Sequence, residues 1–151
     1  NPAWDRVIRR GRARHLARLI EREDLRGVLA SLRAGRVLWY LPDQDHGARR
    51  SVFAPFFGMP AATLTATARL ARISGAAVVP FAHWRAADGR CVIRLEPPLA
   101  DFPGTDAVAD ATRINALVEG WVRAHPAQYL WAHRRFKTRP AGEPRPYARG
   151  G

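Results

Sequence analysis

The first quarter of the chain has helix-capping residues, and its apolar positions recur every three or four residues, which together predict two helices. Asn1 is a typical helix cap and a proline follows it, so a short helix is expected to run to Arg10 and stop at Gly11. An irregular connector is expected over 14–20. Asp24 then begins a second helix, and residues three or four apart form its apolar face: Leu25, Val28, Leu29 and Leu32.

Short apolar runs with strand character follow. Gly35 is expected to end the second helix, and the aromatic and aliphatic run 37–41 predicts a short buried strand. A loop is expected over 43–60, with an extended stretch at 52–56. Helical spacing returns over 61–74, which predicts a third helix.

The second half of the chain predicts a hairpin and then a long helix. The runs 76–84 and 90–95 are expected to be strands, joined by a turn at Asp88-Gly89. Thr105 is the predicted cap of the longest helix and Pro126 its end, with a core face of Ile114, Leu117, Val118, Trp121 and Val122. Together these elements predict an α/β fold, a mixed sheet with one antiparallel hairpin flanked by helices.

Composition favours one domain over residues 1–139, followed by a loosely ordered tail at 140–151 that is rich in Pro, Gly and Arg. The 47% hydrophobic content is sufficient for a core in 151 residues. The longest apolar run, 75–81, is too short to cross a bilayer. A single cysteine, Cys91, excludes an internal disulfide and offers no zinc-ligand cluster, so no metal is expected.

The charge is strongly positive and is carried almost wholly by arginine. The net charge is +12, and Lys137 is the one lysine among 25 basic residues. Genome base composition is an alternative explanation for arginine over lysine, but the sign of the charge is independent of it. We therefore expect anionic partners: lipid phosphates, an acidic carrier protein, an anionic membrane surface or nucleic acid.

Three sequence blocks occur in a fixed order: WYLPDQDHG at 39–47, SVFAPFFG at 51–58 and QYLWAHRRFKTRP at 128–140. With the Asn-Pro start and the Arg-Gly-Arg at 10–12, they resemble the second half of the lipid A biosynthesis acyltransferases. These enzymes are related to the glycerolipid and lysophospholipid acyltransferase superfamily. The resemblance covers nearly the whole chain, and it implies that the α/β fold is an incomplete acyltransferase core.

The resemblance implies a function as well as a fold. It implies transfer of a fatty acyl chain from acyl carrier protein to a hydroxyl of a Kdo-lipid A precursor, with no further cofactor. It also implies a position on the cytoplasmic face of the inner membrane, with the anchor outside this chain. The blocks at 51–58 and 133–138 are more similar to the lauroyltransferase branch than to the myristoyltransferase branch, which implies lauroyl transfer.

The family's catalytic block, His-x-x-x-x-Asp/Glu, is expected to lie before Asn1. The chain does not begin with Met, which predicts a piece of a longer open reading frame that is inactive alone. A literal match occurs at His83 and Asp88. We reject it, because it spans a strand end and a turn, and because it follows the Pro-Asp-x-Asp block rather than preceding it.

Asp43 and Arg12 are the candidate supporting catalytic residues that the resemblance implies. Asp43 follows a predicted buried strand, where α/β sheets deliver side chains to a site. The alternatives are a turn aspartate for Asp43, a role that fits Asp45 better, and a solvated helix-end charge for Arg12. If both are functional, Arg12 holds a phosphate or the thioester carbonyl, and Asp43 orders that arginine or the acceptor hydroxyl.

Basic and aromatic residues are interleaved over 131–139, a pattern that suits an anionic lipid headgroup. The candidate substrate-binding residues are Arg134, Arg135, Lys137, Phe56 and Phe57, with core packing as the alternative for at least one phenylalanine. The competing hypothesis for the whole chain is a small Arg-rich nucleic-acid-binding domain. No nucleic-acid partner is expected, because no known DNA- or RNA-binding pattern accompanies the basic residues.

Overall fold

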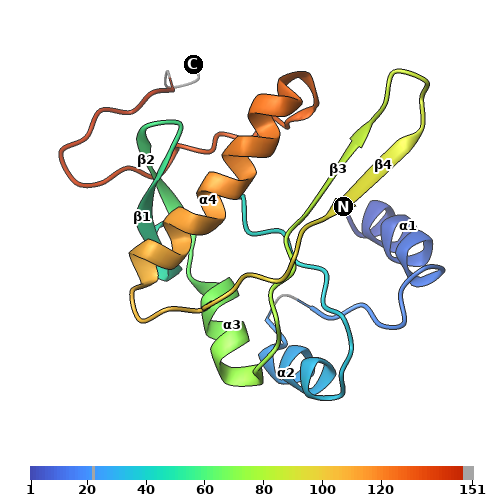
Figure 1. Ribbon diagram of the computed structural model, residues 1–151. Helices are drawn as coiled ribbons and strands as arrows, with labels where there is room; N and C mark the ends of the chain where they lie inside the picture. Colours follow the sequence, from blue (N-terminus) through green and yellow to red (C-terminus); the bar gives the residue numbers. More distant parts are fainter. Residues whose placement is uncertain (22, 148–151) are drawn as a thin grey trace. The chain divides into compact units, whose positions relative to one another are not determined.

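The computed structural model describes residues 1–21 and 23–147. It contains two compact units, Asn1–Leu38 and Trp39–Gly151. Four α-helices, two short 3-10 helices and four strands are found in the part of the chain that the structure describes (Figure 1). The α/β class predicted from the sequence is confirmed.

The first unit holds α1 (Pro2–Ala13) and α2 (Leu25–Arg33). Asn1 caps α1 through a bond that its side-chain oxygen accepts from the Ala3 N–H at 3.0 Å. The expected stop at Gly11 is wrong, because α1 continues through this glycine to Ala13. A glycine costs a helix interior only about 1 kcal/mol, and the left-handed backbone that would end the helix is not adopted there.

The expectations for Asp24, for Gly35 and for the connector between the two helices are confirmed. Asp24 caps α2 by accepting a bond from the Gly27 N–H at 2.8 Å, and Gly35 follows the helix with a left-handed φ of 71°. The irregular connector over 14–20 is also present.

A tight hairpin forms the centre of the second unit. Strand β1 (Ser51–Phe56) pairs antiparallel with β2 (Met59–Leu64), and Phe57 and Gly58 turn the chain with φ values of 49° and 74°. Extended structure at 52–56 is confirmed, but helix at 61–64 is wrong. Ala61, Ala62 and Thr63 are almost completely buried, because β1 pairs with their strand and α4 packs nearby. Their burial in the hairpin overrides the helical propensity of alanine.

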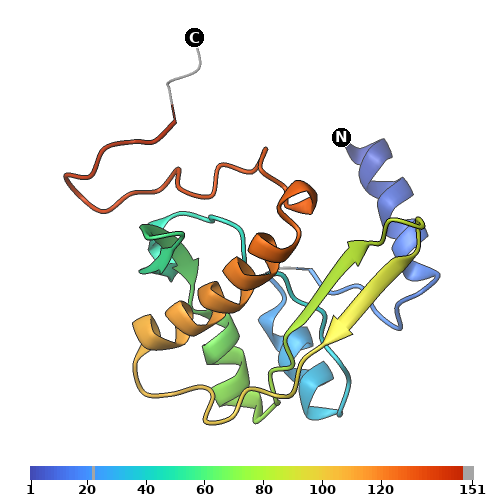
Figure 2. The same cartoon turned by 45° about the horizontal axis from the view of Figure 1, so that its top comes forward.

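Helix α4 (Ala107–Ala124) lies against this hairpin, as both views show (Figures 1 and 2). Asp106 caps it instead of Thr105, and it ends before Pro126 as predicted. Asn115 fastens the helix to the hairpin, since its amide donates to the Pro55 carbonyl at 3.1 Å and to Thr63 Oγ1 at 2.9 Å. Small side chains in this core let helix and hairpin approach closely: Ala54, Ala61, Ala62 and Ala111.

The predicted second hairpin is confirmed as β3 (Phe81–Arg85) and β4 (Cys91–Leu95), which form a two-stranded sheet separate from the first. Its ladder is shorter than the expected run from 76, because Pro97 and Pro98 on the opposite side have no N–H to donate. Before it, α3 (Ala66–Ser74) ends at Gly75, which has a φ of 71°.

The expected buried strand at 37–41 is wrong. These residues have no regular secondary structure and pair with no strand in the described part of the chain. Val37 is 98% exposed, Trp39 51% and Leu41 48%. An apolar run of this kind becomes a buried strand only when other strands pair with it. The residues of the run cannot show whether such strands exist.

The chain after α4 runs beside the β1–β2 hairpin (Figure 2). The 3-10 turns are Ala48–Arg50 and Pro126–Gln128. Arg139 donates to the Pro60 carbonyl at 2.6 Å, and the Tyr147 hydroxyl accepts a bond from the Phe136 N–H at 3.1 Å. Residues 148–151 of the predicted tail lie outside the described residues. None of the helices described is long and apolar enough to cross a membrane.

Candidate functional site

Asp43 lies two residues before Asp45, whose side chain closes a turn with Gly47. Asp43 is half-buried, whereas Asp45 is 2% exposed. Asp45 Oδ1 accepts a bond from the Gly47 N–H at 2.9 Å, which confirms the expectation that Asp45 is a turn aspartate. The same carboxylate also accepts hydrogen bonds from a residue far along the chain, so it does more than stabilise the local turn.

Residues 133–138 hold Asp45 from the other side. The Thr138 hydroxyl donates to Asp45 Oδ1 at 2.8 Å and the Thr138 N–H donates to Oδ2 at 2.9 Å. The Asp45 N–H donates to His133 Nε2 at 3.0 Å, so this ring nitrogen carries no proton of its own. We call this set of bonds among Asp45, His133 and Thr138 the Asp45 clamp.

Arg135, between the two ends of the clamp, points into the core. It is 2% exposed and donates to the Ala62 carbonyl at 2.7 Å, to Thr63 Oγ1 at 2.9 Å and to Asn115 Oδ1 at 3.4 Å. Burial lowers the pKa of Arg135, while the nearby negative charges of Asp45 and Asp43 act in the opposite direction. The predicted headgroup contact finds no support at Arg135, because its guanidinium is enclosed by backbone and side-chain acceptors.

Aromatic rings surround this arginine. Phe56 is 2% exposed, and the guanidinium carbon of Arg135 lies 5.4 Å from its ring centre, so Phe56 is a core residue. Tyr129 lies 6.3 Å from Phe56, centre to centre. Burial and the negative charge of Asp43 raise the pKa of Tyr129 to about 12, so its phenol keeps its proton until the solution is strongly alkaline. Asp43, Tyr129 and Arg135 therefore share one region.

The outer side of this region is basic and aromatic. Phe57 is half-buried at the hairpin tip, its N–H donates to Glu119 Oε2 at 2.6 Å, and the Arg123 guanidinium lies 4.8 Å above its ring. Trp131 is 57% exposed and lies 6.3 Å from Phe57. Of the predicted cations, Arg134 and Lys137 are both exposed, as a surface contact requires.

Arg12 belongs to the first unit, whereas Asp43 belongs to the second. It is exposed in the last turn of α1, where a positive charge interacts favourably with the helix dipole. We expect Arg12 and Asp43 to converge in the functional protein, and this stays a prediction.

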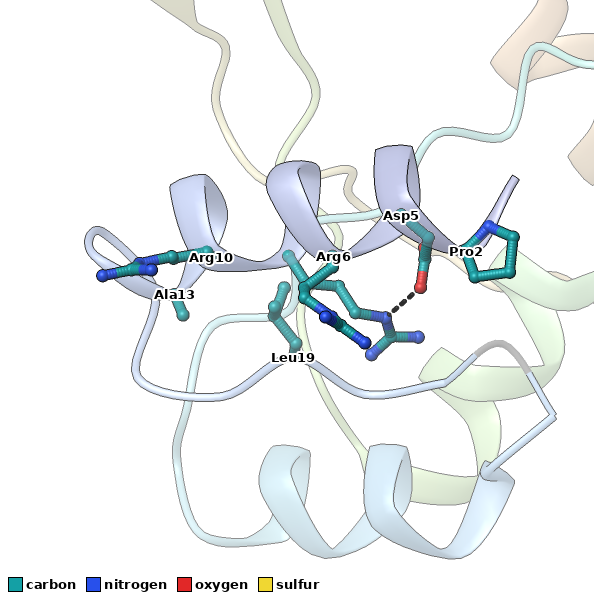
Figure 3. Close-up of a pocket in the computed structure, with 7 residues that line it drawn as sticks. Pro2, Asp5, Arg6, Arg10, Ala13 and Leu19 are labelled. Carbon is teal, nitrogen blue, oxygen red and sulfur yellow. Dashed lines mark hydrogen bonds and ion pairs between the residues drawn. The ribbon is translucent and has the colours of Figure 1, made fainter.

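An open groove runs along α1 (Figure 3). Arg9 lines it and is already paired with Asp5, at 2.8 Å, and with Glu21. The full lining is Pro2, Asp5, Arg6, Arg9, Arg10, Ala13 and Leu19. Arg12 is not among the residues that line this groove.

His83 and Asp88 are engaged elsewhere. His83 is exposed on β3 and stacks with Phe81 at 6.4 Å between ring centres. The Asp88 carboxylate binds the guanidinium Nε of Arg90 at 2.7 Å within the hairpin turn. Neither contact is that of a histidine base oriented by a carboxylate. Cys91 is a free, exposed thiol, and no group of three or more metal-ligand side chains gathers among the described residues.

Spacing in the sequence did not identify three individual members of the site: His133, Thr138 and Tyr129. Their partners lie 88 and 93 residues away for the clamp, and no spacing rule connects such positions. The available signal was the third sequence block itself, in which Tyr129, His133 and Thr138 accompany the arginines.

Comparison with known proteins identifies the family. A family model for bacterial lipid A biosynthesis acyltransferases matches residues 1–138. The lipid A biosynthesis lauroyltransferase of Escherichia coli K12 is 44% identical over 97% of this chain and 49% of its own length. The palmitoleoyltransferase of the same strain is 41% identical over 95% of the chain and 47% of its length. Its myristoyltransferase is 40% identical over 99% of the chain and 47% of its length.

The relatives are thus acyltransferases, and the chain belongs to the bacterial lipid A biosynthesis acyltransferase family. The resemblance seen in the three sequence blocks is confirmed. The chain spans about half the length of the curated relatives it matches. Membership of this family favours the acyltransferase hypothesis over the nucleic-acid-binding one.

Proposed function

We propose that this chain forms part of a lipid A biosynthesis acyltransferase that moves a fatty acyl chain, lauroyl by its sequence blocks, from acyl carrier protein to a hydroxyl of a Kdo-lipid A precursor. The observation that carries the proposal is the family match over residues 1–138, which includes Arg12, the Asp43 turn and residues 133–138. The reaction needs no resident cofactor, because acyl carrier protein supplies the activated acyl group.

The residues of this chain supply binding and orientation rather than the base. Acyl transfer to a hydroxyl needs a base for the hydroxyl proton and positive or hydrogen-bonding groups for the developing oxyanion. We assign the base and its carboxylate to the family's His-x-x-x-x-Asp/Glu block, outside these residues. Arg12 then holds a phosphate or the thioester carbonyl, and the Asp43 carboxylate orders that arginine or the acceptor hydroxyl.

Substitution of either residue tests this assignment in a polypeptide extended to the family's full length. We expect Asp43→Ala and Arg12→Ala each to lower turnover by about tenfold to a hundredfold, as loss of a positioning charge does. The measurement is transfer of a labelled acyl chain from acyl carrier protein to the lipid A precursor. Asp88→Ala and Arg90→Ala change the same residue types in an exposed turn and should leave turnover unchanged. Wild-type turnover in the Asp43→Ala variant would refute the assignment.

The basic and aromatic surface of the second unit is proposed to meet the anionic surface of the inner membrane. Exposed Arg134 and Lys137 provide the charge, Trp131 provides an amphipathic ring of the kind that lies at headgroup depth, and Phe57 provides an apolar ring beside it. The guanidinium of Arg123 also lies over the Phe57 ring and is paired with Glu119 at 2.6 Å. This surface also suits the phosphates of the precursor lipid.

We expect the chain to sediment with vesicles that contain anionic phospholipid more than with neutral ones, and salt to weaken this binding. Each basic residue at such a surface contributes about 1 kcal/mol, so Arg134→Ala with Lys137→Ala should weaken binding by about thirtyfold. Arg90→Ala with Arg94→Ala removes the same charge from the second hairpin and serves as the control. Equal sedimentation with both vesicle types would contradict the membrane proposal.

A further inference from the structure

We propose that Asp45 is a positioning residue: through its bonds to His133 and Thr138 it holds the Asp43 carboxylate in place for acyl transfer, without touching the substrate itself. This inference rests on the proposed function of Asp43. The carboxylate of Asp45 is buried and its oxygens accept three bonds, from Gly47 and twice from Thr138, so it is engaged by the protein itself.

A continuous set of contacts connects the core of the second unit to Asp43. Arg135 is bonded to β2 through the Ala62 carbonyl and Thr63, and to α4 through Asn115. Arg135 therefore fixes the segment 133–138 against the hairpin. His133 and Thr138, at the two ends of this segment, grip Asp45 by its backbone N–H and by its carboxylate.

This grip restrains Asp43, because only Gln44 separates the two aspartates. A residue that lies only two positions from a fixed residue has few accessible backbone conformations. Asp43 therefore cannot move far while Asp45 is held. Tyr129 reports its position, since the Asp43 charge contributes to the raised pKa of that phenol. A polar clamp outside the reacting groups but rigidly joined to the core is the arrangement that preorganised sites require.

The first test needs no activity and uses this chain. Asp45→Asn keeps the shape and one oxygen acceptor but replaces the other acceptor by an NH₂ group, which cannot accept the Thr138 N–H. We expect hydrogen exchange at the Thr138 amide to accelerate at least tenfold. In ¹³Cζ spectra of labelled tyrosine, the Tyr129 titration should move from about 12 to lower pH, because the Asp43 charge is no longer held nearby. Asp88→Asn, in an exposed turn, should change neither signal.

Thr138 provides a milder pair of variants in case Asp45→Asn fails to fold. Thr138→Val removes the hydroxyl donor to Asp45 Oδ1 and keeps the shape, whereas Thr138→Ser retains the hydroxyl. We expect Thr138→Val to shift the Tyr129 titration in the same direction and Thr138→Ser to retain wild-type behaviour. Unchanged exchange and titration in both Asp45→Asn and Thr138→Val would overturn the clamp.

The second test measures acyl transfer in the full-length polypeptide. We expect Asp45→Asn to lower kcat about tenfold with little change in KM, and to have no further effect once Asp43→Asn is present. If Asp43→Asn alone leaves turnover unchanged, the proposed function of Asp43 fails, and this inference fails with it. If Asp43→Asn lowers turnover but Asp45→Asn does not, or lowers it by the same factor in both backgrounds, the positioning role is overturned and the function of Asp43 stands.

Discussion

Replacement of Arg135 by alanine is expected to lower the free energy of unfolding by about 3 kcal/mol or more. The guanidinium is the buried donor for the Ala62 carbonyl, Thr63 Oγ1 and Asn115 Oδ1. Its removal leaves these acceptors without that donor, and an unsatisfied buried polar group costs about 1 to 3 kcal/mol. It also opens a cavity beside Phe56, over whose ring the guanidinium lies.

The neighbouring arginine provides a matched control. Arg134 is exposed and lies 5.9 Å from the Tyr147 ring, so Arg134→Ala should change stability by less than about 0.5 kcal/mol. Urea unfolding followed by tryptophan fluorescence measures both variants under the same conditions. Equal stabilities for the two variants would show that burial of Arg135 contributes nothing to the folded state. Arg135→Lys is not a conservative substitute here, since one ammonium cannot reproduce the planar fork that reaches both β2 and α4.

Local signals in the sequence were sufficient for the elements whose ends are set by their own residues. Several predicted helix ends are confirmed. They are the N-caps at Asn1 and Asp24, the left-handed glycines at 35 and 75, and the end of α4 before Pro126. The hairpin of β1 and β2 was missed because its second strand begins Met-Pro-Ala-Ala, which has poor strand propensity. Pairing with β1 and burial beneath α4 decide its structure, and neither is visible in a short window.

The run at 37–41 shows the converse error. It has the composition of a strand buried on both faces, yet Val37 is almost fully exposed. The pattern describes what these residues would do beside other strands, and no strand in the described residues pairs with them. The curated relatives carry about as many residues again. We expect a strand from outside these residues to supply the pairing in the full-length polypeptide that we propose.

Some residues of the candidate site could be predicted from the sequence, whereas the burial or exposure of others could not. The family resemblance selected Asp43 through the block at 39–47 and Arg12 through the Arg-Gly-Arg at 10–12, and both lie within the matched range. The exposure of Arg134 and Lys137 and the burial of Arg135 could not be predicted, because all three stand in one basic run of the same character. Only the fold distinguishes the arginine that supports the core from the cations that face solvent.

The 151-residue chain alone is expected to catalyse no acyl transfer, whereas a polypeptide extended upstream through the His-x-x-x-x-Asp/Glu block is expected to be active. Asp43 cannot replace a histidine base, since a carboxylate is a weaker base than an imidazole and a poor acceptor for a hydroxyl proton. Positioned general-base catalysis typically contributes about a hundredfold to ten-thousandfold. Without it, binding by Arg12 and Asp43 would orient the substrates but leave the hydroxyl unactivated.

Transfer of labelled acyl chain from acyl carrier protein to the lipid A precursor measures this difference, with both polypeptides at equal concentration. His83→Ala in the extended enzyme should leave turnover close to wild type, because His83 is exposed on β3 and the Asp88 carboxylate binds Arg90. Substitution of the upstream histidine should remove most of the activity. Robust turnover by the 151-residue chain that disappears in its own His83→Ala variant would contradict this prediction, since the His83 and Asp88 pair would then be the catalytic one.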